Sequence, residues 1–358
     1  MDIVTHALAS FAVARGFFPR AGKAVTACTV LAGTIANVDW LSYYFGPSAY
    51  LTWHKTYLHS IFAAVLISAI IPAMLTVAIV RGGLGVDVVA SKGEVVSDDP
   101  GAARNRTLRT LFLTLFTAPL CAALLHILMD ASQSVGVMLF WPFSPKQFAA
   151  DWLPRIDPWV LTILIACIAL PELLHLVGSE IGAKAKKPRG RTGAIVGLAL
   201  VMVYIGVRAT LHSNVVALLE SRTFHGEASR RASAFPESLS LLTWHGVVET
   251  DSALDTIDVN AGSSDTFDAD SSVRVFKPEA SPALDAARNT AAAKRFLATA
   301  QIPKASLEKT ETGYTVILRD LRYSAAGDTQ SEVAALIRLD LNNKVVSQEL
   351  IWAPELRH

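Results

Sequence analysis

The sequence predicts a mainly α-helical, polytopic membrane protein of about six transmembrane helices, followed by a soluble α+β domain. Hydrophobic residues make up 52% of the 358 residues and charged residues only 18%, which is more apolar than a soluble globular chain usually is. The mean hydropathy of +0.38 agrees with this class. The long apolar runs end near residue 213, where polar and turn-forming residues take over.

Five apolar runs approach the length of about 20 residues that a helix needs to cross roughly 30 Å of hydrocarbon. A shorter run at residues 3–19 contains Ala12-Val13-Ala14, which is similar to a signal-peptide cleavage site. The run lacks a basic start, so we expect it to remain as the first span. The five longer runs lie near residues 24–45, 57–80, 107–130, 158–178 and 192–212.

The distribution of basic residues predicts the orientation. Lys and Arg gather in the loops after the first, third and fifth predicted spans, for example at Lys184 and Arg191. The opposite loops hold only Lys55, Lys146 and Arg155. Because cytoplasmic loops carry an excess of Lys and Arg, we expect a bacterial inner-membrane protein with both termini on the extracytoplasmic side.

The soluble domain is predicted for residues 214–358, after a transmembrane domain of residues 1–213. Asn214–Ser221 should continue the last span as a helix, and residues 283–300 form an Ala-rich amphipathic pattern. Ser281 and Pro282 before that pattern suit an N-cap and a first helical position. Strand-like patterns occur at residues 239–250, 314–318 and 334–341.

Histidine and aspartate residues that are far apart in the sequence fall on one side of the predicted bundle. Successive spans run in opposite directions, so the start of the first span lies with the ends of the second and fourth. His126 and Asp130 are four residues apart and therefore share one helical face. Imidazole and carboxylate ligands without thiolate suit Zn²⁺ or another divalent ion such as Mn²⁺. The predicted metal ligands are His6, Asp39, His59, His126 and Asp130.

Four ordered motifs resemble the YdjM-like, LexA-regulated family of inner-membrane proteins, which is described as metal-dependent hydrolases. They are Met1-Asp-Ile-Val-Thr-His6, Asn37-Val-Asp39, His54 with His59-Ser60, and His126-Ile-Leu-Met-Asp130. Phe296-Leu and Asp320-Leu-Arg-Tyr323 extend the resemblance more loosely to the C-terminal domain. The family commonly has Pro-Asp-x-Asp and His-Arg-Gly-x-Thr-His-Ser, whereas this chain has Asn37 and Lys55 in the corresponding motifs.

The resemblance implies a hydrolase, and the His-x-x-x-Asp helix also looks like that of zinc-dependent phospholipase C enzymes. We expect a divalent metal, zinc as first choice and manganese as second, which activates a water for attack on phosphorus or carbonyl. Asp2 is expected to orient His6 or to act as general base, while His54 and Lys55 hold an anionic leaving group. The predicted depth of the site favours a phosphoester of a membrane lipid or of a lipid-linked envelope substrate.

Two other functional classes stay open at this point. The same His and Asp residues would suit a metal or proton path in a transporter, in which case ionisable groups should lie on both sides of the membrane midplane. A non-catalytic sensor or assembly protein whose histidines respond to pH is the other class, and a metal-free protein would favour it. The net charge of +1 gives no reason to expect a nucleic-acid partner.

Overall fold

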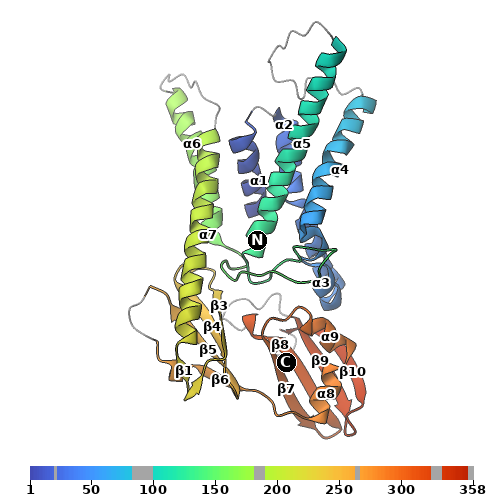
Figure 1. The fold of residues 1–358 in the computed structure, drawn as a ribbon, viewed down its shortest axis with the longest axis vertical. Coiled ribbons are helices and arrows are strands. Elements are labelled where there is room, and N and C mark those ends of the chain that lie inside the picture. Colours follow the sequence, from blue (N-terminus) through green and yellow to red (C-terminus); the bar gives the residue numbers. More distant parts are fainter. Residues whose placement is uncertain (20–21, 83–99, 181–189, 263–266, 324–332, 354–358) are drawn as a thin grey trace. The chain divides into compact units, whose positions relative to one another are not determined.

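The computed structural model describes residues 1–19, 22–82, 100–180, 190–262, 267–323 and 333–353 (Figure 1). Most of two basic loops, at 83–99 and 181–189, lies outside these described residues. Contacts divide the chain into two compact units. The first comprises Met1–Val38 and Lys55–Val207, and the second comprises Asp39–His54 and Arg208–His358. The predicted boundary after residue 213 thus lies close to the structural one at Val207, but Asp39–His54 joins the second unit.

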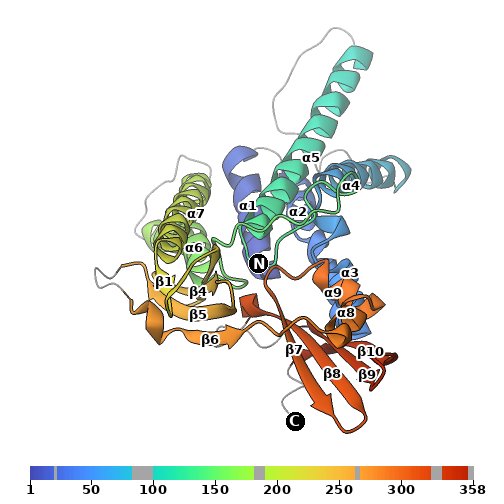
Figure 2. The same ribbon diagram turned by 60° about the horizontal axis from the view of Figure 1, so that its bottom comes forward.

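The first unit is built from helices, because its apolar runs satisfy their backbone hydrogen bonds internally. Figures 1 and 2 show α1, α2, α4 and α5 side by side, with α6 beside α7. The second apolar run stops being α-helical at Gly33 and continues as the 3₁₀ helix η1, Ile35–Phe45. The other elements are α1 (Ile3–Phe17), α2 (Gly22–Ala32), η2 (Tyr57–His59), α4 (Ile61–Gly82), α5 (Pro100–Ala131), α6 (Pro158–Glu180) and most of α7 (Arg191–Glu220).

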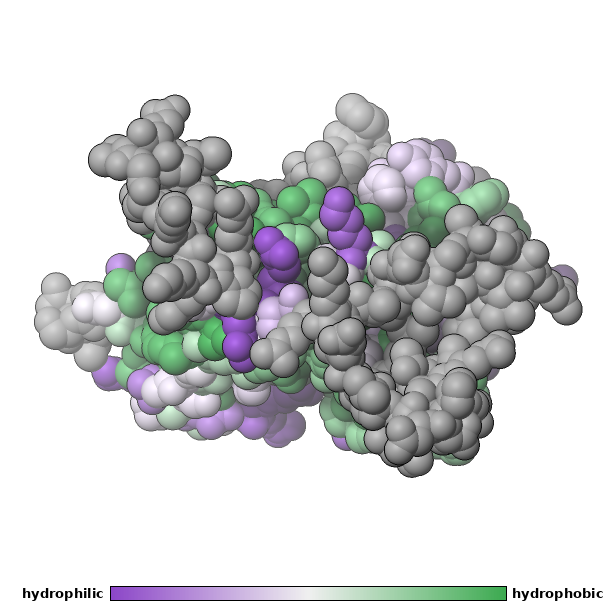
Figure 3. Space-filling view, turned by 90° about the horizontal axis from the view of Figure 1, so that it is seen from above, coloured by the Kyte–Doolittle hydropathy of each residue, from purple (hydrophilic) through white to green (hydrophobic). Residues whose placement is uncertain are grey.

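Three helical segments are long and apolar enough to cross a membrane, among the residues that the structure describes. They are Gly22–Phe45, Phe112–Ala131 and Arg191–Glu220, and a bent pair formed by Pro47–His59 and Ile61–Met74 raises the number to four. Large apolar side chains on α7 such as Val203, which is 63% exposed, suit contact with lipid. Hydrophobic side chains are visible in green among hydrophilic ones on the face drawn in Figure 3.

The second unit contains two four-stranded antiparallel sheets, so the expected C-terminal domain of strands and helices is confirmed. The first sheet has the order β3-β4-β5-β6, with β3 (Arg231–Pro236), β4 (Thr243–Glu249), β5 (Ala253–Asn260) and β6 (Val273–Phe276). The second has the order β10-β9-β8-β7, with β7 (Pro303–Thr310), β8 (Gly313–Asp320), β9 (Val333–Asp340) and β10 (Val345–Trp352). A short hairpin of β1 (Thr223–Phe224) and β2 (Glu227–Ala228) precedes them.

The single helix predicted for residues 283–300 is instead two helices, α8 (Pro282–Arg288) and α9 (Ala291–Leu297). The break occurs because Thr290 starts a new helix as its N-cap, with its hydroxyl accepting a hydrogen bond from the backbone of Ala293. Ser281 caps α8 as expected. Both helices pack on the second sheet through a common core that includes Phe296 and Ile337.

The last turns of α7 and the segment 39–54 are anchored within the second unit. As predicted, the helix continues past residue 214, and Leu219 is buried with Trp244 in the core of the first sheet. Segment 39–54 contains α3 (Pro47–Trp53). Tyr43 packs on Trp352 with 4.5 Å between ring centroids. This aromatic contact explains why the segment groups with the second unit.

Candidate metal centre

Four of the five predicted metal ligands lie together in the first unit. His6 comes from α1, His59 from η2, and His126 and Asp130 from α5. The Nε2 atoms of His6, His59 and His126 lie 3.3, 3.1 and 3.5 Å from the nearest carboxylate oxygen of Asp130. None of the four residues is more than 2% exposed. Three chain segments therefore surround one buried carboxylate with three imidazoles.

The ligand atoms are close enough together to share one ion. One potential ligand atom from each of His6, His126 and Asp130 lies within 4.8 Å of the other two. The His6 and His126 rings stack with 3.8 Å between their centroids, and the His59 centroid is 4.9 Å from that of His126. We refer to His6, His59, His126 and Asp130 as the His/Asp cluster.

Gly33 fixes the orientation of one imidazole in the His/Asp cluster. Its carbonyl oxygen accepts a hydrogen bond from His126 Nδ1 at 2.8 Å. Since a carbonyl only accepts, Nδ1 carries a proton. In the neutral form of the ring the lone pair that a metal ion needs is therefore on Nε2, the nitrogen that lies toward Asp130. A Cβ added at Gly33 would lie 1.9 Å from Ser10 Oγ, so glycine lets the end of α2 approach α1 this closely. Metal-ligating histidines commonly donate their second ring nitrogen to such a carbonyl.

The unsatisfied atoms of the His/Asp cluster fit a bound cation. His126 Nε2 and Asp130 Oδ2 are buried and have no hydrogen-bond partner, although they lie only 3.5 Å apart. His6 Nδ1 is also buried without one. Leaving a buried polar atom unsatisfied costs on the order of 1–3 kcal/mol, so clustered examples call for an explanation. Nitrogen and carboxylate donors converging in this way are what Zn²⁺ prefers.

Asp39, the fifth predicted ligand, is placed in the second unit together with His54. His54 Nδ1 lies 3.3 Å from Asp39 Oδ1, and both side chains are largely buried. The His54 ring also stacks on Tyr50, with 4.6 Å between centroids. The ligand role of Asp39 and the catalytic role of His54 therefore stay predictions.

Asp2 caps the first helix. Its carboxylate accepts hydrogen bonds from the backbone of Thr5 at 2.9 Å and from the Thr5 hydroxyl at 2.6 Å. A carboxylate is favourable there because it satisfies an unpaired N–H group at the start of α1. These contacts give Asp2 a structural task, and its expected roles as general base or partner of His6 stay predictions.

Lys55 lies directly at the His/Asp cluster. Its ammonium is 3.3 Å from Asp130 Oδ1 and donates a hydrogen bond of 2.5 Å to Gln133 Oε1, and the residue is only 4% exposed. The amino group of Met1 contacts both Asp130 and Gln133 as well. Gln133, which sequence reasoning missed, is fully buried. The cluster thus has the Lys55 ammonium as a buried neighbour.

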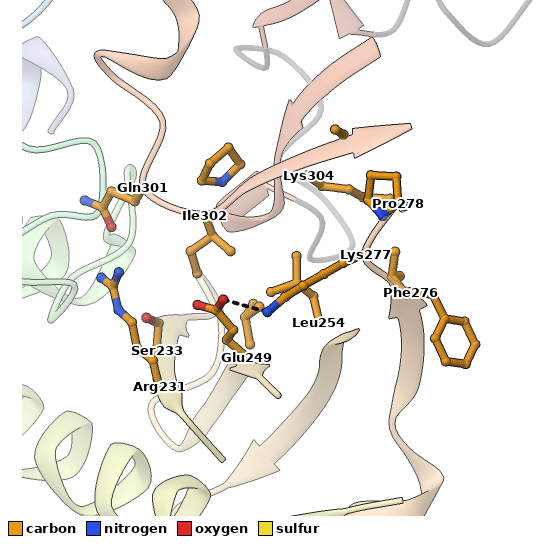
Figure 4. A pocket seen from close by; sticks show the side chains of 14 residues that line it. Arg231, Ser233, Glu249, Leu254, Phe276, Lys277, Pro278, Gln301, Ile302 and Lys304 are labelled. Carbon is orange, nitrogen blue, oxygen red and sulfur yellow. Dashed lines mark hydrogen bonds and ion pairs between the residues drawn. The ribbon is translucent and has the colours of Figure 1, made fainter. Parts of the chain in front are cut away.

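A separate cavity of about 260 Å³ lies in the second unit between the two sheets. Figure 4 shows Glu249 and Lys277 paired in its wall, where Lys277 Nζ donates to Glu249 Oε1 at 2.7 Å. Arg231 and Lys304 also line it. Its lining residues include no histidine or cysteine. The candidate metal centre is therefore the His/Asp cluster, where potential ligand atoms converge.

The helices and this cluster define a helical membrane protein with a buried candidate metal centre. The chain belongs to the YdjM inner membrane protein family, whose model matches residues 1–215. That range contains every predicted site residue, and the resemblance inferred from the motifs is confirmed. Residues 282–357, which include α8, α9 and the second sheet, match the YfhP C-terminal alpha/beta plait domain. Neither the curated proteins nor the solved structures include a match to this chain.

Proposed function

We propose that this protein is a membrane-embedded, metal-dependent hydrolase acting on a phosphoester of a membrane lipid or lipid-linked envelope substrate. The convergence of His6, His126 and Asp130 within 4.8 Å in a buried setting carries the proposal. Membership of an inner-membrane family supports its membrane setting. Ionisable residues gathered inside a membrane domain are costly and usually functional.

In this proposal, His6, His126 and Asp130 hold a divalent ion, and His59 supplies a further nitrogen. Zinc suits these donors best and manganese is the second choice, because the set has no thiolate and only one carboxylate at this position. A bound ion of this kind supplies Lewis acidity and lowers the pKa of a water toward neutrality. The Gly33 carbonyl keeps His126 in the tautomer that ligation requires.

The remaining polar groups are assigned to substrate binding. The buried Lys55 ammonium is a fixed positive charge that favours a phosphoryl anion over a neutral ester, because an ion pair is strong in a site that excludes water. Asp2 is a candidate general base. His54 is a candidate for contact with the leaving group.

We further propose six spans, with the shorter apolar helices Ile3–Phe17 and Pro158–Pro171 completing the set. The excess of basic residues in alternate loops supports a cytoplasmic position for those loops and extracytoplasmic termini. Under this topology the His/Asp cluster lies toward the outer headgroups. A reporter fused after His358 tests the orientation, since only an extracytoplasmic terminus activates a periplasmic reporter enzyme.

The activity is tested with detergent-purified, zinc-loaded protein and a panel of phosphodiester, phosphomonoester and carboxylic-ester lipids. We expect phosphoester hydrolysis that Asp130→Asn lowers by about a hundredfold or more, as loss of a metal-site group does. Asp258→Asn is the matched control, since its side chain is 73% exposed in the second unit. A folded, zinc-loaded protein that hydrolyses none of the panel contradicts the proposal and favours the sensor or assembly class.

A further inference from the structure

Gln133 lies two residues after Ala131, the last residue of α5, and its side-chain amide has one fixed orientation. Nε2 donates to the carbonyl oxygens of Pro154 and Arg155, at 3.1 and 3.0 Å. Because carbonyl oxygens only accept, these bonds identify the nitrogen side of the amide. The oxygen side therefore faces Lys55, and Oε1 accepts from its Nζ at 2.5 Å.

The backbone around Gln133 is held equally firmly. Its N–H donates to the carbonyl of Asp130 at 3.2 Å, which ties it to the last turn of α5. The carbonyl of neighbouring Ser132 accepts from the N–H groups of Trp152 and Leu153, both at 2.9 Å. The amide is thus anchored from the helix end and from the loop before α6.

Both the backbone of Lys55 and the ammonium group of its side chain are constrained. Its backbone has a φ of 56°, in the left-handed region that residues other than glycine rarely adopt. Such a conformation persists when the surrounding structure fixes it, and it is common at ligand sites. Its carbonyl accepts from the N–H of Met138 at 3.3 Å, and its Nζ lies between Gln133 Oε1 and Asp130 Oδ1.

We propose that Gln133 is a positioning residue that holds the Lys55 ammonium beside Asp130, where it binds the phosphoryl anion of the substrate. This inference rests on the proposed function and deepens its substrate class. The two positive charges of a divalent ion and the negative charge of the Asp130 carboxylate sum to one positive charge. The Lys55 ammonium adds a second positive charge. Charges removed from water need compensation, so this buried centre takes an anion in preference to a neutral carboxylic ester.

The test measures two affinities by titration calorimetry on the detergent-purified full-length chain: that for Zn²⁺, and that of the zinc-loaded protein for inorganic phosphate. The variants are Lys55→Met, Gln133→Met and the double variant. Lys146→Met and Gln147→Met are matched controls, because they make the same changes in the loop before α6. The Met1 amino group is the same in all of them.

We expect each single variant to weaken phosphate binding about tenfold or more, the usual effect of losing a hydrogen bond to a charged group. Zinc affinity should not fall. The double variant should lose no more than Lys55→Met alone, because Gln133 acts through Lys55. The two control variants should bind phosphate like the wild type.

Three results overturn the assignment while leaving the metal centre intact: phosphate binding that does not depend on Lys55, additive losses in the double variant, or no phosphate binding at all. A parallel fall in zinc affinity in Gln133→Met also overturns it, since Gln133 would then maintain the whole centre. A wild-type chain that binds no zinc overturns the proposed function itself. The two failures are therefore distinguishable.

Discussion

Each unit of this molecule buries an aspartate completely, and the two sites differ in what surrounds the carboxylate. Asp130 and Asp255 are both 0% exposed, and each has an Oδ2 atom without a hydrogen-bond partner. Asp130 is surrounded by three imidazoles. Asp255, in β5, has Arg274 Nε at 3.6 Å and His225 Nε2 at 3.7 Å.

The difference shows that a buried carboxylate alone does not indicate a metal site. A guanidinium carries a permanent charge and has no lone pair to offer a metal, so Arg274 neutralises Asp255 without making a site. Imidazole offers a lone pair when neutral. Across the residues that the structure describes, the group with convergent ligand atoms is His6, His126 and Asp130. The neighbours of the carboxylate therefore decide between metal binding and structural pairing.

The largest effect is expected for Asp130→Asn, which keeps the shape of the side chain and removes its charge. Zinc affinity should fall about a hundredfold or more, since the substitution removes a ligand rather than a supporting contact. Titration calorimetry on the purified variant measures this. Unchanged zinc affinity would place the metal elsewhere, and would remove the contrast between the two aspartates.

A smaller effect is expected for Gly33→Ala, which acts on the His/Asp cluster through His126. The new Cβ would lie 1.9 Å from Ser10 Oγ, so the backbone must shift and strain the 2.8 Å bond from His126 to the Gly33 carbonyl. We expect a loss of about tenfold in zinc affinity and a stability loss of about 1–3 kcal/mol. Gly206→Ala on α7 is the matched control, since no atom lies within 4 Å of its added Cβ. Equal zinc affinities and melting temperatures in the two variants would contradict this account of Gly33.

Asp255→Asn should affect stability and leave metal content unchanged. Arg274 would lose its partner at 3.6 Å but would keep Glu227 Oε1 at 2.7 Å. The expected cost is therefore about 1–3 kcal/mol, below that of leaving a buried charge with no partner at all. Thermal melting and metal analysis of the same sample check both parts. Loss of metal in Asp255→Asn would show that the second unit also carries a metal site.

The smallest effect concerns Glu227 in β2, whose pKa is lowered to about 2 by hydrogen bonds from the Ser252 side chain and backbone, and by Arg274. A lowered pKa in the folded state means that ionised Glu227 stabilises the fold above its ordinary pKa of 4.5. This contribution is lost as the pH falls from 4.5 toward 2. Melting temperatures of wild type and Glu227→Gln should therefore converge as the pH falls from 6 to 2. A difference that stays constant with pH would rule out the ionisation of Glu227 as its cause.

Much of the His/Asp cluster was predictable, because helix geometry fixes it. The spacing of His126 and Asp130 puts both on one face of α5, and alternating span directions bring the start of α1 to the same end. Lys55 was expected to help hold an anionic leaving group; the structure places it beside Asp130, and the anion-binding role stays a prediction. The YdjM motifs pointed to the same residues.

Other parts were not predictable from local patterns. Gln133 is neutral, and the orientation of its amide depends on the carbonyls of Pro154 and Arg155, some twenty residues later in the chain. Asp2 could have been recognised as an N-cap from its place before an apolar helix.

The strand predictions show the same limit of local patterns. The three predicted strands correspond to β4, β8 and β9, all of which lie inside a sheet. The edge strands β3, β6, β7 and β10 were missed, and so was β5, which lies inside the first sheet. An edge strand such as β7 has mostly exposed and partly exposed residues, so its hydrophobic alternation is weak.

The most direct measurement is metal content by mass spectrometry on gently purified protein, beside a His126→Ala, Asp130→Ala double variant. We expect about one or more zinc or manganese ions per chain in the wild type, as a site with these donors requires. The variant should lose these ions while its melting profile still shows a folded protein. No metal in the wild type, and no uptake when zinc or manganese is added back, would contradict the metal centre and the hydrolase built on it.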